Sequence, residues 1–200
     1  MGPVERVADL PLAAPQERED AARNRMLLLD AARTLIAEHG ADSVTMDDIA
    51  AAAGVGKGTL FRRFGNRAGL MMVLLDDDER NLQHEFMFGP PPLGPGAPPL
   101  DRLLAFGRER MRFAQRHRAL LADANRDPAA RYGAPYVVLR SHVRMLLGEA
   151  GTSGDLDAQA DALLALLDPD YISHRMDRAG VTLEGLAAAW EGLAHKLCGR

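Results

Sequence analysis

Residues 46–64 read MDDIAAAAGVGKGTLFRRF, and this stretch decides the fold of the first part of the chain. Two short helical segments flank the turn Gly54-Val55-Gly56, which is the pattern of a helix-turn-helix. Ala50 is small enough for the two helices to cross closely, and Leu60 closes the small core between them. The second segment, residues 57–64, is therefore predicted to stand out as a probe for the major groove of DNA.

Eight residues in and around this segment have the chemistry that DNA contacts require. Lysine and arginine bind phosphates or guanine edges, glycine lets the backbone approach, and threonine offers a hydroxyl and a methyl group. Phenylalanine can lie along the sugar–phosphate backbone, and the starts of helices add amides that attract phosphate. For Lys57 two contacts stay open, a phosphate or a guanine edge. The predicted DNA-binding residues are Thr45, Lys57, Gly58, Thr59, Phe61, Arg62, Arg63 and Arg67.

Composition limits how such a protein can bind DNA. The 200 residues include 28 Asp and Glu against 24 Lys and Arg, so any nucleic-acid contact must use a local basic patch. The content of 47% hydrophobic and only 5% aromatic residues favours an all-α fold with a substantial core. The single cysteine, Cys198, excludes an intrachain disulfide. With neither a signal peptide nor a long apolar run, the sequence predicts a cytoplasmic protein without a membrane segment.

Periodicity and helix stop signals divide the chain into three parts. Residues 1–19 lack a period and are predicted to be a flexible arm. Residues 20–66 are predicted to form a three-helix DNA-binding domain whose first helix starts at Ala21. Residues 67–200 are predicted to form a larger helical domain, with a Pro- and Gly-rich loop at 89–99. Its helices are expected over 67–88, 100–117, 119–125, 136–150, 156–167, 168–180 and from Thr182 to the end.

The resemblance to a known family extends beyond the helix-turn-helix. Residues 25–70, with the segments LDAARTLIAEHG, TMDDIAAAAGV and KGTLFRRF followed by Asn66-Arg67, closely resemble the N-terminal domain of the TetR family of bacterial transcriptional regulators. The resemblance implies a ligand-responsive regulator, most often a repressor, and not an enzyme. It also implies a C-terminal domain that binds a small-molecule effector and dimerises. The family positions that contact DNA match Thr45, Lys57, Thr59, Phe61, Arg63 and Arg67.

Three positions depart from the family pattern. Gly56 stands where a serine is common, so the probe helix loses a side-chain cap. Phe61 replaces a frequent tyrosine and Arg63 a frequent histidine. These departures predict an altered operator specificity.

Two apolar stripes near the C-terminus predict a homodimer. Paired with the same helices of a second subunit, they would form a four-helix bundle. The alternative is that one subunit buries both stripes in its own core. A twofold dimer would place two probe helices about 34–36 Å apart and would read a near-palindromic operator in double-stranded DNA. The predicted interface residues are Leu156, Ala160, Leu163, Leu164, Leu167, Leu183, Leu186, Trp190, Leu193 and Leu197.

The effector site is predicted among the helices between residues 67 and 150. Such sites are apolar cavities with a few polar groups. Phe106 and Phe113 fit a core position equally well, and Arg110 and His142 fit a surface position. The candidate effector-binding residues are Phe86, Phe106, Arg110, Phe113, His117, Asn125, His142 and Met145.

Other clusters of polar residues do not predict a metal, a cofactor or an active site. The acidic run Asp76–Glu79 points in different directions on a helix and is predicted to be a solvated face. Ser173, His174 and Asp177 lack the glycine elbow of a nucleophilic enzyme. A helical small-molecule carrier or enzyme that kept the fold without DNA binding stays open as an alternative. Such a protein need not retain the basic patch at residues 57–67.

Overall fold

The expected all-α fold is confirmed. The computed structural model describes residues 15–40, 43–118, 120–121 and 132–199, and its regular elements in these ranges are helices without a strand. The chain divides into two compact units between Leu74 and Leu75. The helices are α1 (Pro15–His39), α2 (Met46–Ala52), α3 (Lys57–Phe64), α4 (Arg67–Phe88), α5 (Pro99–Arg116), α8 (Ala134–Glu149), α9 (Leu156–Ala165), α10 (Pro169–Ala179) and α11 (Leu183–Leu197).

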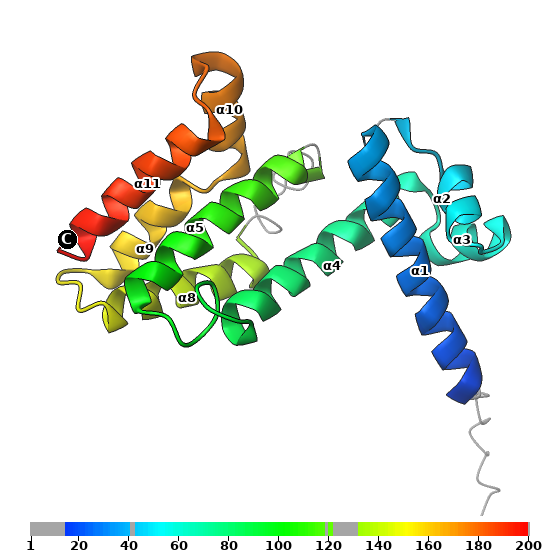
Figure 1. Cartoon of the computed structure of the whole chain (residues 1–200), viewed down its shortest axis with the longest axis horizontal. Coiled ribbons are helices and arrows are strands. Elements are labelled where there is room, and N and C mark those ends of the chain that lie inside the picture. The colour runs from blue at the N-terminus through cyan, green and yellow to red at the C-terminus, as the bar shows by residue number, and fades with distance from the viewer. Residues whose placement is uncertain (1–14, 41–42, 119, 122–131, 200) are drawn as a thin grey trace, which may run out of the picture. The chain divides into compact units, whose positions relative to one another are not determined.

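The first unit consists of α1, α2, α3 and the beginning of α4. Figure 1 shows α2 and α3 side by side next to α1. α1 begins at Pro15, earlier than the expected start at Ala21. Proline fits the first turn of a helix because the N–H that it lacks would have no intrahelical partner there. Residues 1–14 of the predicted arm lie outside the described residues.

The division between the two units falls within α4, so its first residues belong to the first unit and the rest to the second. It starts where predicted, and Asn66 caps it by accepting a hydrogen bond at 2.9 Å from the amide of Gly69. Leu70 and Leu74, in its first two turns, are buried within the first unit. The expected boundary after residue 66 therefore marks the start of a helix, whereas the compact units divide two turns later.

Short-range signals set the ends of the C-terminal helices. Asp168 accepts hydrogen bonds from the amides of Asp170 and Tyr171, which confirms it as the N-cap of α10. Gly180 ends α10 in the left-handed conformation with φ of 65°, which a residue with a side chain adopts only with strain. Thr182 then caps α11 through the amide of Gly185. The predicted helix over 119–125 lies mostly outside the described residues.

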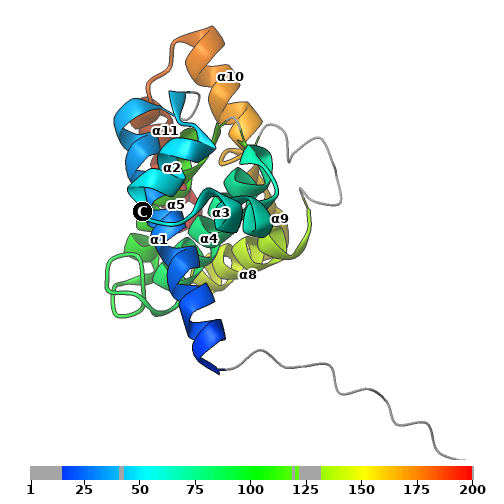
Figure 2. The same ribbon diagram turned by 90° about the vertical axis from the view of Figure 1, so that its right-hand side faces the viewer.

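Four helices of the second unit enclose its core. Each of α5, α8, α9 and α11 packs against two of the others, and Figure 1 shows them as neighbouring rods. Figure 2 gives the view turned by 90°, with α8 in yellow-green. The space-filling view shows α11 in orange and red lying directly on α5 in green. α10 packs on α5 as well. The core of this unit thus lies between α5 and the C-terminal helices.

Trp190 of α11 is the largest side chain of this core. Its indole N–H donates a hydrogen bond at 3.0 Å to the carbonyl oxygen of Leu163 in α9, and its exposed fraction is 1%. Gly107 of α5 makes room for the ring, since a Cβ atom there would lie 2.3 Å from the nearest ring carbon. A tryptophan on α11 and a glycine on α5 are therefore matched in size across the helix contact.

Candidate functional site

A complete capping box holds the start of α2. The amide of Asp48 donates to the hydroxyl of Thr45 at 3.2 Å, and the amide of Thr45 donates back to the Asp48 carboxylate at 3.1 Å. The Thr45 hydroxyl also donates to that carboxylate, at 2.6 Å. These bonds from Thr45 hold the pKa of Asp48 below its usual value. Thr45 is confirmed as an N-cap, and this end of α2 is fixed by local contacts.

The turn between α2 and α3 has the expected geometry. Gly54 adopts a φ of 64°, and the amide of Val55 returns to the carbonyl oxygen of Ala50 at 3.0 Å. Leu60 and Phe64 of α3 point into the core of the unit and are buried. Gly56 precedes α3 without a side-chain cap.

α3 presents one face to solvent, opposite its buried face. A Cβ atom placed at Gly58 would meet nothing within 4 Å, so the backbone is open to an approaching molecule. Thr59 is half-buried, and the ring of Phe61 is exposed although it is large and apolar. The predicted DNA-binding residues on this face are Lys57, Gly58, Thr59, Phe61, Arg62 and Arg63.

The cations around α3 have different partners. The ammonium of Lys57 lies 2.5 Å from the carboxylate of Asp47 in the first turn of α2. Arg62 donates to the carbonyl oxygen of Gly58 at 3.2 Å and to the hydroxyl of Thr59 at 3.3 Å. Arg62 therefore keeps its net positive charge, whereas a carboxylate neutralises Lys57.

Two further arginines are held by backbone oxygens. Arg63 donates at 2.8 Å to the carbonyl oxygen of Ala21 in α1, and Arg67 donates at 3.4 Å to that of Val44. Because a carbonyl oxygen is a neutral acceptor, it orients the guanidinium of Arg63 without cancelling its charge. Asp47 is a residue of this surface that the sequence did not single out, and only its acidic character close to a basic patch could have indicated it.

Three of the predicted effector-binding residues form one aromatic cluster in the second unit. The ring of Phe86 lies 5.3 Å from that of Phe106, and the ring of His142 lies 4.4 Å from Phe86 and 5.2 Å from Phe106. All three are buried. The structure thus brings these residues of α4, α5 and α8 together as packed side chains.

The other predicted effector-binding residues do not join this cluster. Arg110 pairs with Glu79 of α4 at 2.7 Å, and its guanidinium lies 4.8 Å from the ring centre of the buried Phe113. His117 contacts Asp78 of α4 at 3.1 Å. Met145 is exposed on α8, which does not suit a pocket lining, and Asn125 lies outside the described residues.

The acidic run on α4 requires a correction. Asp78 and Glu79 were expected on a solvated face, but both are largely covered. Glu79 pairs with Arg110 of α5, and Asp78 contacts His117 just after the end of that helix. Within the part of the chain that the structure describes, no group of three potential metal ligands is found. The sequence could not show the pairing with Arg110 because that residue lies on a helix about 30 residues further on.

A second buried polar pair was missed by the sequence. Arg102 of α5 and His142 of α8 have exposed fractions of 8% and 6%. Nε of Arg102 and Nε2 of His142 are buried without a hydrogen-bond partner, and the carboxylate of Glu149 is 3.6 Å from the guanidinium. Burial lowers the pKa of His142 to about 4, and the charge of Arg102 adds to this effect. Arginine is so rarely buried that Arg102 attracted no attention in the sequence.

Six of the predicted dimer-interface residues are buried within the subunit. Their side chains have almost no exposed surface left, because α5, α8, α9 and α11 close around them. The prediction is wrong for these residues, and the alternative of a common subunit core holds for them. They are Ala160, Leu163, Leu164, Leu167, Leu186 and Trp190.

The outward faces of the same helices have a different composition. The remaining predicted residues, Leu156, Leu183, Leu193 and Leu197, are partly exposed. Small residues occupy the exposed positions between them. They were not among the predicted interface residues, because that prediction followed the stripes of large apolar side chains. They are Ala158, Ala162 and Ala165 on α9, and Gly185, Ala188, Ala189 and Gly192 on α11.

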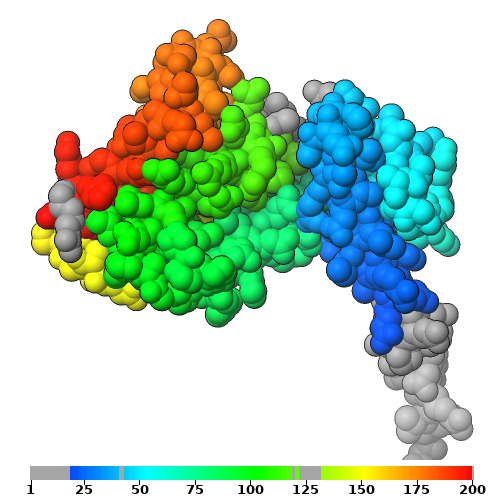
Figure 3. Space-filling view, viewed as in Figure 1, coloured from blue at the N-terminus to red at the C-terminus, as the bar shows by residue number. Residues whose placement is uncertain are grey.

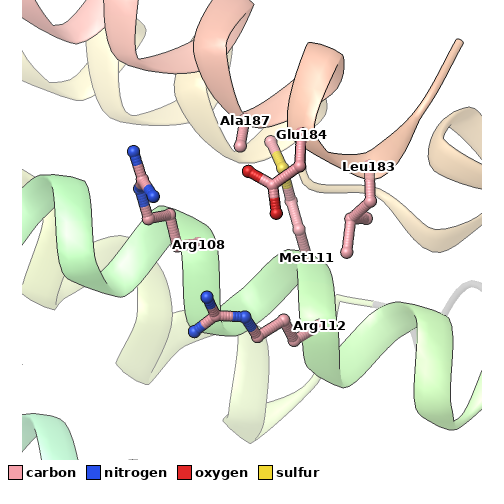
Figure 4. Close-up of a pocket in the computed structure, with 6 residues that line it drawn as sticks. All are labelled: Arg108, Met111, Arg112, Leu183, Glu184 and Ala187. Atoms are coloured by element: carbon pink, nitrogen blue, oxygen red, sulfur yellow. The ribbon is translucent and has the colours of Figure 1, made fainter.

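A shallow depression lies between α5 and α11. Figure 4 shows Arg108 and Arg112 on α5 facing Glu184 and Leu183 on α11, with Met111 and Ala187 between the helices. It is too small for an organic effector and includes no predicted effector-binding residue. Among the described helices, none is long and apolar enough to cross a membrane. His174 is exposed, and Asp177 pairs with Arg118 at 2.9 Å.

Comparison with known proteins identifies the type of DNA-binding domain in the first unit. Residues 28–72 match the model of the bacterial regulatory proteins of the tetR family. Over these residues, which lie in the first unit, the chain carries the DNA-binding domain typical of tetR-family regulators. An HTH-type transcriptional regulator of Mycobacterium tuberculosis is 29% identical over 188 residues, covering 88% of this chain and 85% of the relative.

Solved structures share the fold of this chain. A TetR-family transcriptional regulator from a Rhodococcus species superposes with a TM-score of 0.60 at 22% identity, covering 88% of this chain and 99% of that one. A transcriptional regulator from Saccharomonospora viridis, solved in complex with choline, gives 0.63 at 20% identity, with 86% and 95% covered. The chain therefore shares the fold of these regulators, and its first unit contains the matched helix-turn-helix domain.

Proposed function

We propose that this TetR-family regulator is a repressor that binds a near-palindromic operator as a homodimer and is released by a small-molecule effector. One observation carries the proposal. α3 is anchored by Leu60 and Phe64 and exposes a contiguous set of groups suited to DNA. A carrier or enzyme with the same fold would have no need of that surface. A regulator of this kind acts on the bacterial chromosome, so we place it in the cytoplasm.

Dimerisation through α9 and α11 fits their outward faces. Small side chains let helices of two subunits approach closely, and the partly exposed leucines beside them supply apolar area. A twofold axis would place two copies of α3 about 34–36 Å apart, one turn of DNA. Sedimentation velocity should therefore show a dimer, and substitution of Ala189 by glutamate should favour the monomer.

The effector is proposed to bind near Phe86, Phe106 and His142. Side chains fill this region in the described residues, so a ligand must separate the helices there. α4 is one continuous helix from Arg67, next to the proposed DNA contacts, to Phe86 in this cluster. A choline complex of a protein with the same fold supports a small organic effector. Release requires the effector to bind the operator-free state more tightly.

Two experiments test these proposals. Selection from random DNA duplexes should recover a near-palindromic sequence, and recovery of none would favour a protein that kept the fold without DNA binding. Native mass spectrometry of the protein from its host should detect a retained small molecule. Adding that molecule should lower operator affinity, and equal affinity with and without it would contradict the proposed release.

Replacing Lys57 by alanine is expected to weaken operator binding. If Lys57 contacts a phosphate, the loss is equal for all sequences, and the salt dependence falls by about one unit of slope per subunit. If it reads a guanine, discrimination at one operator position relaxes by about 1–3 kcal/mol. Fluorescence anisotropy over a series of salt concentrations separates the two results.

Lys196 provides the matched control, since it is the only other lysine of the chain. It is exposed in the last turn of α11. The Lys196→Ala variant removes the same charge and should bind the operator as the wild type does. Undiminished binding by the Lys57→Ala variant would remove Lys57 from the interface.

A further inference from the structure

The partner of Lys57 distinguishes it from the arginines of α3. Its ammonium lies 2.5 Å from the Asp47 carboxylate, while Arg62 and Arg63 donate to neutral oxygens. Lys57 and Asp47 are each more than half exposed, at 64% and 58%, so both are open to the molecule that approaches α3. Asp47 therefore places a negative charge on a surface that must meet phosphates.

The sequence left two contacts open for Lys57, a phosphate or a guanine edge. Its ion pair with Asp47 favours the guanine edge. To bind a phosphate, Lys57 must leave Asp47, and the gain is small because one charged partner replaces another. A guanine edge offers neutral acceptors, O6 and N7. The ammonium has three donors, so it can reach a guanine while one donor stays on Asp47.

The positions of both residues agree with this assignment. Lys57 is the first residue of α3, and the N-terminal residues of a recognition helix are those that reach base edges. Asp47 lies in the first turn of α2. Arg62 and Arg63, in the last turn of α3, donate to neutral oxygens within the described residues and keep their charge for phosphates.

We propose that Asp47 is a specificity-determining residue that keeps Lys57 from phosphates and directs it to a guanine of the operator. This inference rests on the proposed function, since it presupposes operator binding. The ion pair does not lower the operator affinity of the wild type, because it stays intact when Lys57 binds the guanine. On unrelated DNA the pair withholds one cation from the backbone.

The test compares two duplexes for each variant, the selected operator and a random duplex of equal length. For Asp47→Asn, affinity for the random duplex should rise about fivefold per subunit, with a salt dependence steeper by about one unit of slope per subunit. Operator affinity should rise less. The ratio of operator to random affinity should therefore fall, and Asp47→Glu, which restores the charge, should recover part of it.

The Lys57→Ala background shows whether Asp47 acts through Lys57. In that background, Asp47→Asn should change both affinities by the same small factor and leave their ratio unchanged. Asp30→Asn is the matched control, because Asp30 is an exposed acid of the same unit that pairs with Arg33 on α1. That variant should also leave the ratio unchanged.

Two results would overturn the inference in different ways. If Asp47→Asn strengthened binding to both duplexes equally, Asp47 would be a competing charge without a role in specificity, although operator binding itself would stand. If the wild type preferred no operator over the random duplex, the proposed function would fail and the inference with it.

Discussion

The Trp190→Ala variant is expected to lose about 3–5 kcal/mol of its free energy of unfolding. The indole fills the space that Gly107 leaves open, and its N–H bonds the carbonyl oxygen of Leu163. Truncation would remove this apolar contact, leave a cavity and orphan the carbonyl oxygen. Since domains are typically stable by only about 5–15 kcal/mol, the loss should be conspicuous in urea unfolding followed by far-UV circular dichroism.

Gly107→Ala tests the same contact from the other helix. Alanine favours a helix over glycine by about 1 kcal/mol, but its Cβ would lie 2.3 Å from the indole ring. Overpacking should therefore destabilise the protein by about 1–3 kcal/mol, and the cost should disappear when Trp190 is already alanine. If Trp190 served a subunit interface instead, its truncation would dissociate the dimer and leave the unfolding midpoint of each subunit unchanged.

Acid is expected to destabilise the protein through His142. Its pKa falls from 6.5 to about 4 on folding, so between these values the unfolded chain binds a proton that the folded chain does not. The stabilisation is complete above pH 6.5 and is lost as the pH falls from there to about 4. It amounts to something on the order of 3 kcal/mol.

The His142→Phe variant removes this titration while keeping an aromatic ring between Phe86 and Phe106. Urea unfolding measures the free energy of unfolding of both proteins at pH 7 and at pH 4. Between these values the wild type should lose on the order of 3 kcal/mol more than the variant. His174→Phe, a change at an exposed position, serves as the control and should follow the wild type. Parallel pH profiles for wild type and His142→Phe would show that His142 titrates alike in both states.

The sequence predicted the first unit in detail because its signals are local. The Thr45 cap and the Gly54 turn depend on residues within about one helical turn, and the structure has both. The same holds for Asp168, Gly180 and Thr182 at the ends of the C-terminal helices. The inward position of Leu60 was predicted, and the helical period that places it there also fixes the outward face of α3. The roles of that face in DNA binding stay predictions.

Tertiary structure decided which surface each apolar stripe covers. Trp190 and Leu163 were expected at a subunit interface, yet they contact each other within one subunit. A stripe of apolar residues has the same period whether its own core or a second chain covers it, so periodicity cannot tell the two apart. Asp47 and Lys57 illustrate the same limit for charge, since they are ten residues apart and meet only because a tight turn folds α3 back onto α2. The sequence by itself determined where helices begin, turn and end. Their partners depended on the fold, because burial and ion pairing are properties of residues that are close in space.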